Sequence, residues 1–157
     1  MKKLLLISVL ILCVNSIYAQ TNIRKGSNPY GTVLYNWDGK NLRPGSKSYG
    51  TDLRQGSNSY GTIMINWDGK NIRKGSNPYG TVLYNWDGKN LRKGSNSYGN
   101  VLYNWDGTNI RQGSNSDGTV LYNYNGKSIR QGSNSDGTVL YNADGKIPTA
   151  ILIYVIE

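Results

Sequence analysis

The sequence has no histidine, and its single cysteine, Cys13, lies within the first twenty residues. Nucleophilic catalysis of the Ser-His or Cys-His kind therefore has no base or thiol in the rest of the chain. Zinc and most transition metals are disfavoured as well, because His and Cys are their usual ligands. One cysteine also cannot form an internal disulfide framework.

Acidic residues are few, and most of them have a structural explanation. The nine are Asp38, Asp52, Asp68, Asp87, Asp106, Asp117, Asp136, Asp144 and Glu157. All but Asp52 and Glu157 occupy turn positions, where the backbone favours Asp. The repeated pattern singles out no close pair of carboxylates for acid–base chemistry. Calcium needs several oxygens around one loop, and Asp-Gly-Lys-Asn supplies one carboxylate beside a lysine. We therefore expect no enzyme, no metal and no other cofactor.

The N-terminus reads as an export signal. Lys2 and Lys3 precede an apolar run over residues 4–14, and a small residue, Ala19, ends the segment. This layout is typical of a secretory signal peptide over residues 1–19, cleaved near Ala19. The run is too short to span a bilayer as a helix. Cleavage lowers the formal charge from +9 to +7, and we expect a secreted, periplasmic or envelope protein.

Tandem repeats of 19 residues fill the rest of the chain, which we interpret as a single domain over residues 20–157. The regular repeats cover 23–41 and 53–146, with a shortened repeat at 42–52 and an apolar segment at 147–157. An arginine marks the repeat, as at Arg73 and Arg92, and the spacing is broken only between Arg43 and Arg54, where it is 11.

Each repeat carries two turn signals separated by short β-prone segments. Asp-Gly, as at Asp87-Gly88, is typical of a two-residue hairpin, which would pair Trp86 with Lys89 and Tyr84 with Leu91. Asn-x-x-Gly, as at residues 77–80, predicts a second turn closed by three residues. The sequence therefore predicts an antiparallel all-β meander with no helix apart from the signal peptide.

Alternation along the strands assigns side chains to two faces. Val82, Tyr84, Trp86 and Leu91 share the more apolar face, which we expect to be buried. The opposite face carries polar residues such as Asn85, Asn90 and Arg92, and we expect it to be more exposed.

The segment 147–157 is almost wholly apolar and departs from the repeat. Hairpin repeats cannot bury their apolar faces alone, so closure into a shallow barrel or radial array is expected. The apolar segment is then expected to fill the middle of the array or to complete its sheet. An alternative is membrane contact by five side chains: Ile151, Leu152, Ile153, Val155 and Ile156.

The whole layout resembles the β-flower proteins. The resemblance is carried by the signal peptide, by Asp-Gly turns followed by Ile-Arg or Leu-Arg, as in residues 87–92, and by the apolar C-terminal segment. It covers residues 23–157 and implies a shallow, symmetric barrel of hairpins in a secreted or envelope protein of bacteria. It carries no catalytic residues. The five units from Leu53 onward suggest five-fold symmetry, with residues 23–41 as a sixth petal or a closing flap.

Aromatic residues are the best functional lead, because rings beside Asn and Arg can stack on sugars or other flat ligands. The candidate ligand contacts are Trp37, Trp67, Trp86 and Trp105 on one rim and Tyr30, Tyr60, Tyr79 and Tyr98 in the opposite turns. The alternative is that the Trp rings pack against neighbouring hairpins. We expect a binding or structural module whose partner is a glycan or an envelope protein. An exported protein is a poor candidate for nucleic-acid binding.

Overall fold

The computed structural model describes residues 21–45 and 63–157, and within them it contains twelve strands and one helix. The helix is α1 (Thr149–Ile156). The strands are β1 (Thr21–Lys25), β2 (Val33–Trp37), β3 (Asn41–Pro44), β4 (Ile65–Trp67), β5 (Asn71–Lys74), β6 (Val82–Trp86), β7 (Asn90–Lys93), β8 (Val101–Trp105), β9 (Asn109–Gln112), β10 (Val120–Tyr124), β11 (Ser128–Gln131) and β12 (Val139–Ala143).

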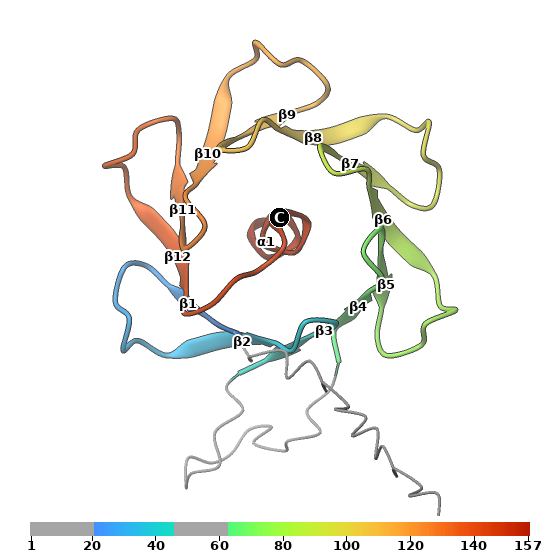
Figure 1. Cartoon of the computed structure of the whole chain (residues 1–157), viewed down its shortest axis with the longest axis horizontal. Coiled ribbons are helices and arrows are strands. Elements are labelled where there is room, and N and C mark those ends of the chain that lie inside the picture. The colour runs from blue at the N-terminus through green and yellow to red at the C-terminus, as the bar shows by residue number, and fades with distance from the viewer. Residues whose placement is uncertain (1–20, 46–62) are drawn as a thin grey trace, which may run out of the picture.

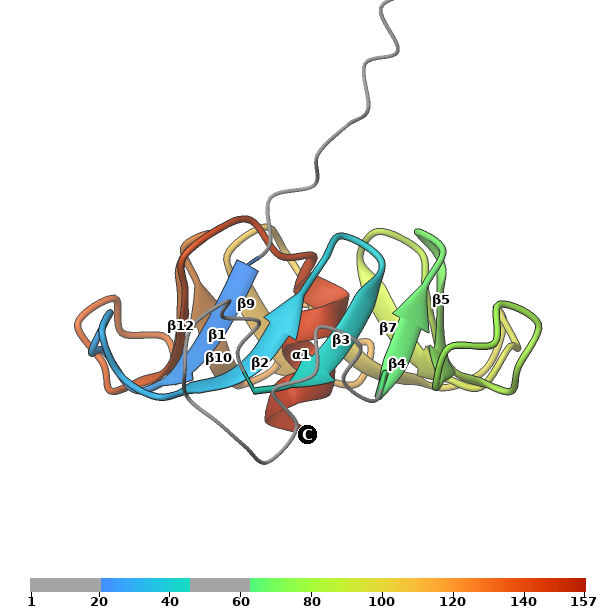
Figure 2. The same cartoon turned by 90° about the horizontal axis from the view of Figure 1, so that it is seen from below.

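The strands form one closed antiparallel barrel in which every strand pairs with its neighbours in the chain and β1 pairs with β12. Figure 1 shows the ring from its open end, with α1 in the centre and loops projecting outward. Figure 2 shows the same ring from the side as a shallow disc crossed by the helix. The predicted all-β, shallow radial array is confirmed.

The Asp-Gly turns join the two strands of each hairpin at one rim, and we call them rim turns. They are centred one residue later than predicted: Trp86 pairs with Leu91 and Tyr84 with Lys93. The side chain of Asp87 explains the shift, because its Oδ1 accepts the backbone N–H groups of Lys89 and Asn90 at 2.9 and 2.6 Å. Asp87 thus stands before the loop as an Asx turn, and Gly88 takes the positive φ of 97°.

This shift moves the pairing by two residues, so each side chain keeps its predicted face. The predicted burial is only partly right. Leu91 is fully buried, but Asn85 on the opposite face is also buried, and Tyr84 is half-buried. The register shifts by one residue beside Leu83, which places Val82 opposite Arg73. Leu83, and not Val82, packs against the core.

The core is a ring of aliphatic side chains closed around α1. One residue from each hairpin contributes, and all six are at most 1% exposed: Ile23, Leu42, Ile72, Leu91, Ile110 and Ile129. Ile151, Leu152 and Ile153 of the helix complete the same cluster. The apolar segment is therefore buried, as predicted, and it fills the middle of the array.

The prediction of no helix beyond the signal peptide is wrong, and closure of the sheet gives the reason. With β1 paired to β12, the barrel offers no edge to a further strand. A segment inside an apolar core must satisfy its own backbone N–H and C=O groups, and a helix does so without a partner. Pro148 starts the helix, and its carbonyl accepts the N–H groups of Ile151 and Leu152.

The sixth hairpin is assembled from the two ends of the repeat region. Asp144 follows β12 and accepts the backbone N–H of Asn22 at 2.7 Å, its Nδ2 at 2.8 Å and Arg24 Nη1 at 2.9 Å. These are the bonds that Asp87 makes to Asn90 and Arg92 within one hairpin. Rim-turn chemistry thus joins residues about 120 positions apart.

The barrel has six hairpins, so the predicted five-fold core is corrected to six, with residues 23–41 as an integral part of the ring. The shortened repeat does not break the up-down order, because β3 pairs antiparallel with β4. The chain between them, residues 46–62, lies outside the described residues.

Candidate functional site

The outward loops are the most regular exposed feature of the ring. We call them petal loops; the described ones span residues 26–32, 75–81, 94–100, 113–119 and 132–138. In each, an Asn side chain fixes the tip: Asn96 Oδ1 accepts the N–H of Tyr98 at 2.9 Å, and the carbonyl of Asn96 accepts the N–H of Gly99 at 3.2 Å. The tip residue is therefore held by local turn chemistry.

A buried asparagine on the strand paired with the one that leads into the loop anchors each described petal loop to the barrel. Asn85, only 1% exposed, donates its Nδ2 to the carbonyls of Gly94 at 2.8 Å and Asn96 at 3.0 Å. The same arrangement holds the loops after β5 and β1 through Asn66 and Asn142. Burial of the polar face is thus a consequence of holding the loops in place.

Tyrosines at three petal tips are almost completely exposed. Tyr30 and Tyr79 are 93% exposed and Tyr98 is 96% exposed, and they are the exposed large hydrophobic residues of the described chain. Tyr60, the fourth predicted tyrosine, lies outside the described residues. In the described part of the chain these rings are left exposed, so they are available to a partner.

The tryptophans lie at the other end of the strands and face inward. Trp37 is 2% exposed, and Trp67, Trp86 and Trp105 are half-buried against the core. The rings of Trp86 and Trp105 have centroids 6.3 Å apart at 37°. The structure therefore places the predicted Trp and Tyr contacts apart, and the Trp rings pack between neighbouring hairpins.

The aspartates of the rim turns are engaged in ion pairs. Asp87 accepts Arg92 Nη1 at 2.6 Å and Asn90 Nδ2 at 3.0 Å, and equivalent pairs join Asp68 to Arg73 and Asp106 to Arg111. Burial opposes ionisation of Asp87, but the hydrogen bonds from Arg92 and Asn90 outweigh it and hold the pKa of the carboxyl below its usual 3.8. These carboxylates stabilise turns and stay ionised at neutral pH.

A second aromatic group surrounds the C-terminal end of α1. Tyr84 meets Tyr154 edge-on with centroids 6.2 Å apart. Burial, followed by the nearby carboxylate of Glu157, raises the pKa of Tyr84 to about 12. The half-buried tyrosines here belong to the barrel lining and differ from those at the petal tips.

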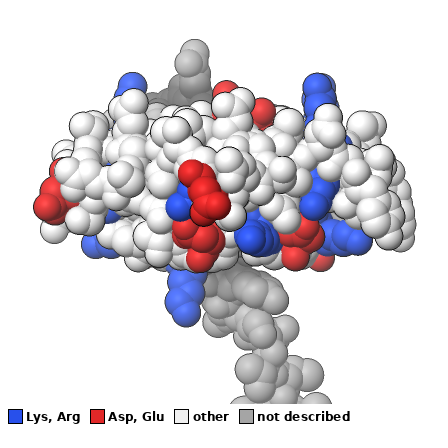
Figure 3. All heavy atoms as spheres, turned by 90° about the horizontal axis from the view of Figure 1, so that it is seen from above, with Lys and Arg blue, Asp and Glu red and all other residues white. Residues whose placement is uncertain are grey.

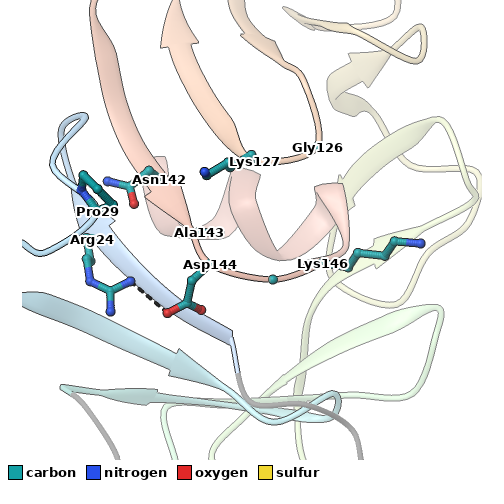
Figure 4. A pocket seen from close by; sticks show the side chains of 9 residues that line it. Arg24, Pro29, Gly126, Lys127, Asn142, Ala143, Asp144 and Lys146 are labelled. Atoms are coloured by element: carbon teal, nitrogen blue, oxygen red, sulfur yellow. Dashed lines mark hydrogen bonds and ion pairs between the residues drawn. The ribbon is translucent and has the colours of Figure 1, made fainter.

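Two shallow depressions adjoin the segment that leads from β12 to α1. Figure 4 shows the first, of about 350 Å³, where Arg24 and Asp144 face each other, Lys127 lies beside Asn142, and Lys146 points away. The second, of about 540 Å³, lies between Trp37 and residues 145–148. Ala143 occupies the position of the tryptophans in other hairpins, and Tyr124 donates its hydroxyl to the carbonyl of Ile147 at 3.5 Å. The depressions mark the passage of the chain into the ring.

Within residues 21–45 and 63–157, no group of three or more potential metal-ligating side chains is brought together. No helix in this part of the chain is long and apolar enough to cross a membrane.

A closed ring of six two-stranded hairpins around a central helix defines a radial β-barrel with petal loops. Residues 48–152 match the family of 6-fold beta flower proteins, and the chain belongs to this family. The search of curated proteins and the search of solved structures gave no match.

Proposed function

We propose that this β-flower protein is a non-enzymatic binding module, exported to the cell envelope or beyond, that contacts its ligand with the petal tips. The observation that carries the proposal is the exposure of Tyr30, Tyr79 and Tyr98 at 93–96%. An exposed tyrosine offers a partner both an apolar ring face and a hydroxyl for hydrogen bonding.

Preorganisation supports the same conclusion. The tip of each loop is fixed by its own Asn, and the base of the loop is fixed by a buried Asn of the barrel. Little conformational entropy is therefore lost when the rings bind, which favours recognition by a rigid array. Several equivalent tips on one ring also allow multivalent attachment to a repetitive ligand such as a glycan.

Export is supported by the layout of residues 1–19, with two lysines before an apolar run and Ala19 at its end. Mass spectrometry of the protein recovered from the producing cell tests this part of the proposal. A chain that begins at Gln20 supports export, and an intact N-terminus in the cytoplasm contradicts it.

The alternative of membrane attachment through residues 151–156 has less support. Ile151, Leu152 and Ile153 are at most 2% exposed inside the barrel. They offer no apolar surface to a bilayer unless the ring opens.

Co-sedimentation with insoluble envelope polysaccharide tests the binding role. The variant Y30S/Y79S/Y98S should lose most of the bound fraction, whereas Y30F/Y79F/Y98F, which keeps the rings, should retain it. Equal binding by the serine variant and the unmodified protein would show that the petal tips do not carry binding.

A further inference from the structure

The ring has two kinds of petal, and they differ in charge. Three described tips carry tyrosine, whereas the equivalent positions in the loops after β9 and β11 carry Asp117 and Asp136. The aspartates sit in the same turn, since Asn115 and Asn134 accept their N–H groups at 2.9 Å. The difference is therefore one of chemistry and not of backbone.

A second position changes together with the tip. The last residue of the strand that leads into a petal loop is lysine before each described tyrosine tip: Lys25, Lys74 and Lys93. It is glutamine, Gln112 or Gln131, before each aspartate tip. The positions are structurally equivalent, because the N–H of Lys74 donates to the carbonyl of Thr81 and that of Gln131 to Thr138. All five side chains are exposed.

Among the described residues, the petal lysines and tip aspartates form no ion pairs. The five ion pairs of the described residues all use arginine, and none involves a petal lysine or a tip aspartate. Tyrosine petals are therefore basic and aromatic, and aspartate petals are acidic.

The acidic petals, β9–β10 and β11–β12, are neighbours in the ring, and so are the basic petals β5–β6 and β7–β8 (Figure 1). The third basic petal, β1–β2, borders the acidic petal β11–β12. In the side view of Figure 3, acidic atoms form the outermost edge on the left and none lie at the opposite outer edge. One sector of the ring thus combines unpaired cations with exposed aromatic rings.

We propose that the adjacent tyrosine petals β5–β6 and β7–β8 form a sector that binds an acidic polysaccharide, with Lys74 and Lys93 contacting its anionic groups and Tyr79 and Tyr98 stacking on its sugar rings. This rests on the proposed function and names its ligand class. Stacking requires an exposed π-face, and unpaired lysines attract a polyanion. A linear polymer with a repeated charge matches adjacent, equivalent petals better than a compact ligand does. The acidic petals would repel the same polymer and so confine it to one sector.

Affinity measurements with polygalacturonate and neutral dextran test the inference on the purified protein. The variant K25Q/K74Q/K93Q places at each position the residue found in the acidic petals. The matched control K40T/K70T/K89T removes the same charge from the rim turns, where Thr108 shows that threonine is accepted. We expect the petal variant to bind polygalacturonate about ten-fold more weakly or worse, with a flatter salt dependence, and the rim variant to bind like the unmodified protein.

Four outcomes would overturn the inference. Equal weakening by both lysine variants would indicate non-specific attraction to net charge. Equal binding of dextran and polygalacturonate would show that the protein does not select an acidic ligand. Self-association that D117N/D136N abolishes, without polysaccharide binding, would point to a second copy of the chain as the partner. If the petal lysine variant is unaffected while Y30S/Y79S/Y98S still loses envelope binding, this inference fails and the proposed function stands.

Discussion

Replacing one side chain at the centre of the ring tests whether α1 is part of the core. Ile153 is fully buried between the helix and the surrounding strands. The change Ile153→Ala removes buried aliphatic groups and leaves a cavity, which destabilises proteins by about 2–5 kcal/mol. That is a large fraction of the free energy of unfolding of a typical domain, about 5–15 kcal/mol.

Ile156 provides a control on the same helix. It has the same side chain but is only half-buried at the end of α1. We expect Ile156→Ala to lower the free energy of unfolding by less than half as much as Ile153→Ala. The comparison cancels differences in intrinsic helix propensity, because both changes are Ile to Ala.

Urea unfolding followed by fluorescence gives both values, provided that the slope of the transition stays constant. The reasoning would be refuted if the two variants unfold at the same urea concentration, or if Ile153→Ala leaves the midpoint unchanged. A chain ending at Lys146 should lose its cooperative unfolding transition, because the aliphatic side chains that line the barrel would no longer have α1 to pack against. A truncated chain that melts at the temperature of the full protein would exclude the helix from the core.

Three further predictions follow from the turns, the loops and the C-terminus. Asn125→Asp gives Arg130 the carboxylate partner that the equivalent arginines have, and it should raise the free energy of unfolding by at most about 1 kcal/mol. Because the pKa of an ion-paired carboxyl is lowered in the folded protein, this gain should be present at pH 7 and be lost as the pH falls below about 4. Thermal melts at several pH values measure it. Asn85→Ala removes both anchors of the loop after β7 and should speed amide hydrogen exchange there, with the loop after β11 unchanged as the internal control; equal exchange would contradict the anchoring role. Glu157→Gln should lower the pKa of Tyr84 from about 12 without restoring its usual 10, because burial of the ring remains. A pH titration of the tyrosine ring carbons by NMR measures this pKa, and an unchanged value would contradict the prediction.

The sequence was sufficient to predict the strands, the turns and the side-chain faces, because Asp-Gly and Asn-x-x-Gly recur at fixed intervals. The exact pairing could not be predicted from turn residues alone. It depends on the carboxylate of Asp87, which binds backbone groups of the turn and moves its centre by one residue. The burial of Asn85 was missed because it follows from a loop that folds back against the polar face.

The central helix could not be read from local preference either. Ile151, Ile153 and Val155 are β-branched and favour strands, so the helix follows from closure of the barrel, a property of the whole chain. The petal chemistry, in contrast, is visible in the sequence. In the described petals lysine accompanies tyrosine, as in Lys74 with Tyr79, and glutamine accompanies aspartate, as in Gln131 with Asp136, whereas Gln55 precedes Tyr60 elsewhere in the sequence. Only the structure shows that each of these described pairs shares a petal.

The pairing of β1 with β12 also fixes the order in which the fold can be completed. During synthesis β1 is made first of the twelve strands, yet its second partner, β12, emerges more than a hundred residues later. Until then one side of β1 is an open strand edge, able to pair with another nascent chain. Asp144 lies between β12 and the helix, so the ring closes only when the last repeat arrives, and the helix follows within a few residues. A chain interrupted before Asp144 would therefore lack both the contacts that Asp144 makes to β1 and the central helix α1. It would expose the edge of β1 and the apolar interior of the barrel together.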